Sequence, residues 1–436
     1  MKNNILKLLL LLLPLFVFQS CMKDQDDVFD EPSSLRMQKA LDNTRKVLRE
    51  SEKGWLIDYY VGDNQKYGGY AFTVKFDSLT CTASSELSAD TATSYYKLTT
   101  DDGPVLTFDT YNTVLHALAT PSADNYEGSH ADYEFIILSA DSNEVVLKGK
   151  KTGSIMKMHP LTETSSAYLS RVDSLVGNFV INGASGTVDK TSLDMLVDID
   201  NRQIEYSSSN DSTISGYTAF TMTDKGVRLY EPITINGLKL QNFIFDANKT
   251  TLTCTDASNV TLKGTLPIGY FKYSDYAGDY SFKYSVPVSG KLSQVTMDVK
   301  LTPSGDGTTY KLDGLSSKFR PVLKYNKSKG ILELNSQVIG EYQGYKIWLC
   351  AWGLATGGNL LWNPDAGMVL KYDPAGSLSG KNAFKWVSNG YSGLSTDSFI
   401  MWLTDPNGKN EGIFVNSDWA VNGSNRFYYL HSLIKK

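Results

Sequence analysis

The side chains that most often perform catalysis are sparse in this sequence. Its four histidines are His116, His130, His159 and His431, and no two of them have the four-residue spacing of a helical zinc site. HExxH zinc motifs, GxSxG nucleophile elbows and Walker A loops are also absent from the sequence. A dispersed catalytic triad stays open, because triads are recognised by geometry rather than by spacing. We nevertheless predict ordinary loop or strand-end histidines and no enzymatic activity.

Carboxylates are plentiful, and a glycosidase needs only two of them facing a sugar, but no pair stands out among so many turn residues. Two segments have the oxygen-rich spacing of a cation loop, Asp198–Asn201 and Asp405–Glu411. Each lacks the remaining ligands of a complete calcium motif, and Asp-Pro-Asn-Gly is a strong turn signal without any metal. We therefore predict turns at both places, with no metal site and no cofactor.

Tryptophan is the residue type whose distribution is uneven. Of the seven tryptophans, six lie between residues 348 and 419. Three of these are in strand-like stretches and are predicted to be core residues: Trp348, Trp386 and Trp402. Trp352, Trp362 and Trp419 lie among Gly, Asn and Asp, in predicted loops, where binding residues concentrate. Because indole rings stack on sugar rings or peptide side chains, these three are the candidate ligand-binding residues; the alternative is that they pack a protein core.

The N-terminus predicts export and a lipid anchor. Lys2 and Lys7 accompany an apolar run over residues 8–18, which is too short for a transmembrane helix and suits a signal peptide. The following Ser20-Cys21 resembles a bacterial lipobox, in which the cysteine becomes the lipid-modified first residue. We therefore expect a signal peptide over residues 1–20 and a lipid anchor on Cys21; the alternative is an ordinary secretory signal with a chance cysteine.

Residues 21–33 form an acidic segment that predicts a solvated tether. The segment resembles the acidic export signal of surface lipoproteins in Bacteroidota-type bacteria. That resemblance implies an outer-membrane protein that is held by its lipid alone and faces the cell exterior.

Composition excludes several other classes of protein. The net charge is −5, and the basic residues form no block, which argues against a nucleic-acid partner. Beyond Cys21, the cysteines are Cys81, Cys254 and Cys350, with no CxxC pair. We predict that they are buried apolar residues rather than zinc ligands or a disulfide framework.

The elements that would position the tryptophans are predicted to be strands. One helix is expected over residues 35–53, where apolar residues recur at helical spacing before Gly54. After it, short β-rich runs alternate with Asp, Asn, Gly and Ser clusters about every 8–12 residues, which is typical of sandwiches and barrels. The predicted fold is all-β, with one short N-terminal helix before the strands.

Internal repetition suggests about three tandem antiparallel sandwich-like or barrel-like modules. Residues 96–115 and 310–332 share YKL, then PVL, an aromatic residue, Asp or Asn, and a later aliphatic-Leu pair. We interpret this shared segment as a duplicated hairpin, because its polar residues favour turns and none is reactive. The predicted domains are a helix and first module over 34–165, a second module over 166–267, and a tryptophan-rich third module over 268–436. The alternative is a two-domain all-β protein.

Several segments of the first module together resemble a known family: Trp55 with the preceding helix, Gly69–Phe72, Gly103–Asn112, His116, Asp132–Phe135 and Leu147–Lys151. They resemble a domain-of-unknown-function family of Bacteroidota lipoproteins that is encoded beside starch-utilisation-system-like importers. The resemblance implies two partners, a TonB-dependent outer-membrane channel and its lidding lipoprotein. It supplies no catalytic residues.

These observations predict a non-catalytic accessory subunit of an outer-membrane nutrient importer. It would bind cargo, an oligopeptide or an oligosaccharide, or dock on the channel complex. The alternatives are a surface hydrolase of glycan or peptide and a structural spacer or adhesin.

Overall fold

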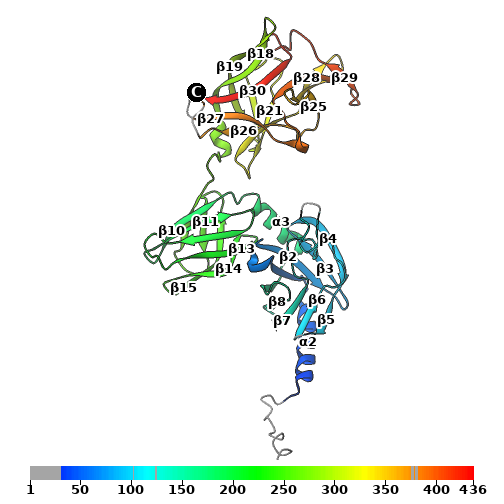
Figure 1. The fold of residues 1–436 in the computed structure, drawn as a ribbon, viewed down its shortest axis with the longest axis vertical. Coiled ribbons are helices and arrows are strands. Elements are labelled where there is room, and N and C mark those ends of the chain that lie inside the picture. The colour runs from blue at the N-terminus through cyan, green and yellow to red at the C-terminus, as the bar shows by residue number, and fades with distance from the viewer. Residues whose placement is uncertain (1–30, 102, 123–124, 375–377, 379–381) are drawn as a thin grey trace, which may run out of the picture. The chain divides into compact units, whose positions relative to one another are not determined.

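The protein is described by a computed structural model over residues 31–101, 103–122, 125–374, 378 and 382–436 (Figure 1). Cys21, the predicted signal peptide and most of the predicted tether lie outside these residues. Strands dominate the described chain, and the predicted all-β fold is confirmed. The chain divides into two compact units, Met1–Ser170 and Arg171–Lys436. No helix in the described part of the chain is both long and apolar enough to span a membrane.

Helix α2 covers Ser33–Glu50 and ends three residues before the predicted end at Lys53. Its apolar stripe buries Leu41, Val47 and Leu48, and the Leu48 carbonyl accepts a hydrogen bond of 2.9 Å from the Trp55 indole. A second helix, α3 over Ser165–Val176, was not predicted, since its serine-rich sequence carries only a short apolar stripe. Three short 3₁₀ turns complete the helical elements of the described residues: Asp63–Gln65, Tyr273–Tyr276 and Tyr391–Gly393.

The first module is a nine-stranded antiparallel sheet in which neighbouring strands are consecutive in sequence at every pairing but one. The strands are β1 (Trp55–Tyr60), β2 (Gly69–Phe76), β3 (Thr80–Ser85), β4 (Ser88–Tyr95), β5 (Lys97–Thr100), β6 (Pro104–Thr107), β7 (Glu134–Ala140), β8 (Val145–Gly149) and β9 (Ile155–Pro160). Strand β9 pairs with β1, and the two edge strands of the sheet are β4 and β5, which a single residue, Tyr96, joins. Apolar side chains from these strands and from α2 form one core.

The second module is a closed eight-stranded barrel. Its strands are β10 (Gly183–Val188), β11 (Thr191–Asp198), β12 (Gln203–Ser207), β13 (Ser215–Met222), β14 (Gly226–Ile235), β15 (Leu238–Asp246), β16 (Thr251–Cys254) and β17 (Thr261–Thr265). The last strand pairs with the first, with Ala184 opposite Gly264. Closure leaves neither strand as an open edge, which removes a site for unwanted pairing.

The third module contains a closed ring of eight strands and a side sheet. The ring strands are β18 (Gly278–Val288), β19 (Lys291–Pro303), β20 (Thr309–Asp313), β21 (Val322–Asn326), β22 (Ile331–Asn335), β26 (Gly367–Tyr372), β27 (Ala383–Ser388) and β30 (Arg426–Lys435). Strand β30 closes this ring by pairing with β18 on one side and β27 on the other.

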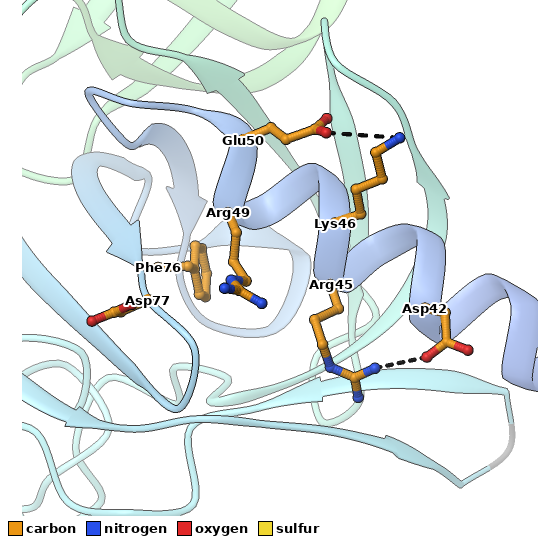
Figure 2. Close-up of a pocket in the computed structure, with 7 residues that line it drawn as sticks. All are labelled: Asp42, Arg45, Lys46, Arg49, Glu50, Phe76 and Asp77. Atoms are coloured by element: carbon orange, nitrogen blue, oxygen red, sulfur yellow. Dashed lines mark hydrogen bonds and ion pairs between the residues drawn. The ribbon is translucent and has the colours of Figure 1, made fainter.

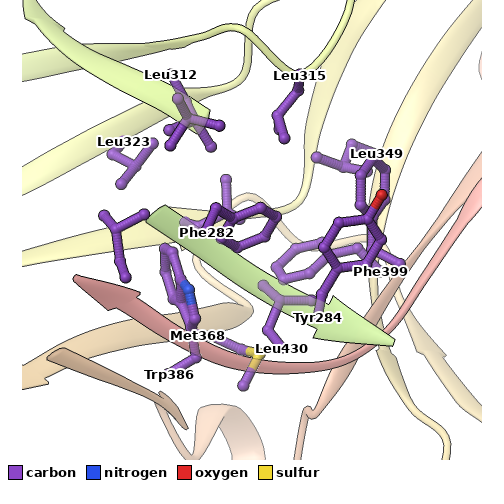
Figure 3. Packing of buried hydrophobic residues seen from close by; sticks show 14 of the residues in the cluster. Phe282, Tyr284, Leu312, Leu315, Leu323, Leu349, Met368, Trp386, Phe399 and Leu430 are labelled. Carbon is purple, nitrogen blue, oxygen red and sulfur yellow. The ribbon is translucent and has the colours of Figure 1, made fainter. Parts of the chain in front are cut away.

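The side sheet branches from β30 and shares its core with the ring. Its strands are β23 (Gln337–Tyr342), β24 (Tyr345–Gly353), β25 (Asn359–Leu361), β28 (Ser398–Thr404) and β29 (Asn410–Ile413). Figure 3 shows side chains of both parts packed together, including Phe282 and Leu323 of the ring and Leu349 and Phe399 of the side sheet.

The repeated segment is a duplicated hairpin only in its first half. YKL and PVL lie on neighbouring strands in both copies, β5 with β6 and β20 with β21. The second half forms a hairpin only in the third module, between β21 and β22. In the first module the partner of β6 is β7, which begins at Glu134, so the predicted hairpin of residues 96–115 is wrong for the part that follows β6.

Asn112 explains this difference between the two copies. Its amide donates to the Ala92 carbonyl at 3.2 Å and to the Ser94 hydroxyl at 3.0 Å, while its oxygen accepts from two backbone N–H groups. Asn112 is buried, and its two bonds to Ala92 and Ser94 tie the segment that follows β6 to β4, an edge strand of the sheet. The turn residues of this segment can be recognised in the sequence, whereas its contact with β4 depends on the tertiary structure.

Candidate ligand-binding face

The three tryptophans predicted to bind ligand do not lie together. Trp419 is only 9% exposed and belongs to the core of the third module, where its ring stacks on Phe319 at 6.0 Å with an interplanar angle of 3°. A methyl group at Gly340 would lie 2.6 Å from the Trp419 ring, so this packing is tight. Trp419 is therefore a core residue in the structure, as the packing alternative proposed.

Trp362 belongs to a cluster with two tryptophans that were predicted to be core residues. Trp348 on β24 is directly opposite Trp402 on β28. The Trp362 ring lies 6.0 Å from Trp348 and 5.8 Å from Trp402, at angles of 75° and 87°. All three side chains are half-buried rather than buried. Edge-to-face packing of this kind is favourable beyond the area that it buries.

The polar edges of this tryptophan cluster are held in place by hydrogen bonds. The Trp348 indole N–H donates to the Thr404 hydroxyl at 3.1 Å, and the Trp402 indole N–H donates to Asn410 Oδ1 at 2.6 Å. Two of the rings are therefore fixed by their neighbours as well as by packing. Fixed aromatic rings lose little conformational entropy when a ligand binds.

The cluster lies on the side of the side sheet that faces away from the core. Strand residues alternate between the two faces, and the neighbours Leu349 and Met401 point into the core. Ile413, opposite Trp402 on β29, is 42% exposed and extends the apolar surface. The cluster is thus accessible at its margin and supported by the sheet underneath.

Trp352 extends the same face along β24. It is four residues from Trp348, so both side chains point to one side of the strand, about 13 Å apart. Its half-buried ring lies 5.7 Å from Tyr428 on β30, whose hydroxyl accepts a hydrogen bond of 3.1 Å from Arg426. We name the set Trp348, Trp352, Trp362, Trp402 and Tyr428 the aromatic face.

Sequence alone could not assign Trp348 and Trp402 to this face. The stretch around Trp348 is apolar at both odd and even positions, so the alternation of side chains does not indicate which phase points inward. The register of β24 with β28 decides which side chains point inward, because it aligns two tryptophans on one face and Leu349 with Met401 on the other.

A cleft of about 580 Å³ lies beside α2 in the first module. Figure 2 shows Arg45 paired with Asp42, at 2.7 Å, and Lys46 paired with Glu50, at 3.7 Å. Arg49 extends beside the Phe76 ring in the same view. Because cations and carboxylates are mixed along the cleft, it has no dominant charge with which to select a ligand.

The histidines do not form a recognisable catalytic centre. The closest arrangement to a nucleophile and base is Ser285 with His431, whose Oγ and Nε2 are 3.0 Å apart. Ser285 is only 6% exposed, and no carboxylate in the described part of the chain forms an ion pair with His431. His116 lies between the rings of Tyr111 and Tyr133, at 5.4 and 5.1 Å.

The two segments with cation-loop spacing form hydrogen-bonded turns. Asp198 accepts from the backbone N–H groups of Asp200 and Asn201, and Asp405 accepts from that of Lys409 at 2.7 Å. Within the described residues, no three His, Cys, Asp or Glu side chains are grouped closely enough to hold a metal ion. The cysteines Cys81, Cys254 and Cys350 are free and buried, as predicted.

Comparison with known families identifies the family of this chain. The family described as "Domain of unknown function (DUF4302)" matches residues 25–247, more than half of the 436 residues. The chain belongs to the DUF4302 family. A second domain of unknown function, DUF4987, matches residues 253–402. A comparison with curated proteins found no match.

The boundary between the two family matches falls inside the closed barrel. The DUF4302 match ends just after β15, and the DUF4987 match begins within β16. Strands β16 and β17 complete the barrel, so the DUF4302 region lacks two strands of the module that it begins. The aromatic face belongs to the third module and lies outside the DUF4302 match, and all of it except Tyr428 falls within the DUF4987 match.

Proposed function

We propose that this DUF4302 protein is a non-catalytic lipoprotein of the bacterial cell surface. It would be an accessory subunit of an outer-membrane nutrient importer that holds oligosaccharide or oligopeptide cargo on the aromatic face. The observation that carries the proposal is the outward, half-buried tryptophan cluster of Trp348, Trp362 and Trp402, with two indole N–H groups already bonded within the protein.

The chemistry of this face suits cargo binding better than turnover. Indole rings offer apolar contact to the C–H faces of sugars and to peptide side chains without any reactive group. The groups at its margin, Lys346, Arg426 and Asn410, are hydrogen-bond donors and acceptors that orient a polar ligand. Because the rings are not coplanar, we expect several weak contacts rather than one long stacking platform.

The proposed lipid anchor and the proposed partner proteins are inferred from the sequence. The lipobox-like Ser20-Cys21 and the acidic segment after it support anchoring to the outer membrane with the protein facing outward. The expected partners are a TonB-dependent channel and its lidding lipoprotein. A membrane pull-down from the native bacterium, using a tagged chain, tests this part of the proposal independently of cargo binding.

The binding proposal is tested with the full chain and a panel of oligosaccharides and oligopeptides. A cargo that binds the folded state raises the melting temperature by mass action. Trp402→Ala and Trp362→Ala should each weaken binding of the best ligand by about tenfold. Tyr217→Ala is the matched control, because it removes a ring that is 74% exposed on a different barrel. Absence of any ligand shift together with absence of a co-purifying channel would refute the proposal.

A further inference from the structure

The third module has a second cleft, of about 420 Å³, at the point where β27 and β30 separate. These strands pair only from Ala383 to Lys385, and the earlier part of β30 pairs with β28 instead. The separation leaves an opening on the ring that is lined by Trp386, Val387, Leu430 and His431. The cleft shares no residue with the aromatic face.

Two lysines flank one buried serine in this cleft. Ser432 on β30 is directly opposite Lys283 on β18 and Lys385 on β27. With strands about 4.8 Å apart, the two lysine backbones are about 10 Å from each other. At this separation, both ammonium groups can reach the same small ligand above Ser432.

The charge of the cleft is positive. Lys385 is paired with Asp373 at 3.1 Å, but Lys283 forms no ion pair with any residue that the structure describes. No Asp or Glu is among the described residues that line the cleft. An unpaired ammonium in a partly enclosed site favours a negatively charged ligand.

One polar group beneath the cleft has no hydrogen-bond partner. Ser432 is 0% exposed, and its Oγ is not hydrogen-bonded. Buried polar groups are normally paired, and leaving one unpaired costs about 1–3 kcal/mol. A hydroxyl is a hydrogen-bond donor, so a ligand that supplies an oxygen acceptor would satisfy it after a small movement of the lysine stems.

The remaining wall is apolar and neutral. Leu378, Val387 and Leu430 offer hydrocarbon surface beside the lysines. Burial and the nearby charge of Lys283 lower the pKa of His431, so its imidazole is neutral at pH 7. Its Nε2 is 3.0 Å from the Ser285 hydroxyl, which fixes the ring at the margin of the cleft.

We propose that this cleft binds the carboxylate group of a small organic ligand, with Lys283, Lys385 and Ser432 around the oxygens and the ligand body against Leu378 and Leu430. Two sources share this chemistry, a uronic acid and the terminal carboxylate of a peptide. The cleft is separate from the aromatic face. Carboxylate binding in the cleft can therefore be tested independently of cargo binding on the aromatic face.

The test measures affinity of the full chain at low salt, by calorimetry or by ligand-observed NMR. Glucuronic acid and N-acetylphenylalanine represent the two sources, and glucuronamide and N-acetylphenylalanine amide are their neutral counterparts. We expect at least one acid to bind more than tenfold tighter than its amide. The preferred acid identifies the source. Equal affinity for acid and amide in both pairs, or no binding of either acid, would overturn the proposal.

Variants locate the binding to this cleft. Lys283→Gln should weaken binding of the acid by about tenfold, whereas Lys300→Gln, an equal change of charge at an exposed position on β19, should not. Ser432→Ala should weaken binding several-fold without lowering the melting temperature, because the hydroxyl has no partner to lose. Equal effects of Lys283→Gln and Lys300→Gln would show a general charge effect and refute the site.

Discussion

Asp132 and Gly149 touch so closely that no side chain other than hydrogen fits at residue 149. A Cβ atom there would lie 2.2 Å from Asp132 Oδ2. The Asp132 carboxylate is buried and accepts hydrogen bonds from the Lys151 N–H at 2.6 Å and from the Thr152 hydroxyl at 2.5 Å. It thereby holds the turn between β8 and β9. Two of the sequence segments that suggested a family resemblance are therefore in contact, and their role is structural.

Gly149→Ala should destabilise the first module, because the new methyl group must displace the carboxylate and its hydrogen bonds. We expect a loss of about 2 kcal/mol or more in the free energy of unfolding. Denaturant unfolding measures the change. Gly177→Ala is the control, since a methyl group there meets its nearest atoms at 3.7 Å, an ordinary contact. Equal stability of the two variants would contradict the contact.

Trp362 and Trp402 should be energetically coupled, because their rings pack edge to face at 5.8 Å. A double-mutant cycle with alanine at both positions should give a coupling energy of about 0.5–1.5 kcal/mol. The matched cycle pairs Trp352 with Trp402, which belong to different ends of the aromatic face, and should be additive. Additivity in both cycles would mean that the cluster does not form in solution.

Closure of the barrel indicates which fragments of the chain should fold on their own. A fragment of residues 31–247, which ends with the DUF4302 match, lacks β16 and β17 and leaves β10 and β15 as open edges. It should aggregate or unfold at a lower temperature than a fragment of residues 31–267, which keeps the closed barrel. Size-exclusion chromatography and thermal unfolding of the two fragments provide the comparison. Better behaviour of the shorter fragment would show that the barrel does not depend on closure.

His116 should make stability depend on pH on the acid side. Burial lowers the pKa of His116 from its usual 6.5, although backbone hydrogen bonds oppose the shift. The unfolded chain therefore takes up a proton at a higher pH than the folded chain, and stability falls as pH drops from 6.5 toward the folded-state pKa. His116→Gln should flatten this part of the curve. The difference from wild type should be constant above pH 7.5, about one unit above the usual pKa.

Cys21→Ala should release the protein from membranes, because it removes the thiol that the proposed lipid would modify. Cell fractionation and labelling with a palmitate analogue measure anchoring and lipidation directly. Cys81→Ala is the control, since this thiol is buried in the first module and should leave anchoring unchanged. Continued membrane association of the Cys21 variant without label would remove the lipoprotein assignment.

The all-β fold and the first helix were predictable because they depend on local patterns. Short β-rich runs separated by turn residues specify strands, and the apolar stripe before Gly54 specifies α2. Helix α3 was not predicted, because its short serine-rich sequence has little helical periodicity of apolar residues. The repeated YKL and PVL segments form a hairpin in both copies, since a hairpin joins strands that are close in sequence.

The sequence by itself determined the all-β class, the first helix, the likeness to a lipoprotein signal and the concentration of tryptophan in the third module, all of which reside in neighbouring residues. Only the tertiary structure decided which tryptophans meet. Trp419 is in the core because Gly340, far from it in sequence, leaves room for its ring. Trp348 and Trp402 share one face because strand register aligns residues that are 54 positions apart, and no local pattern contains that register.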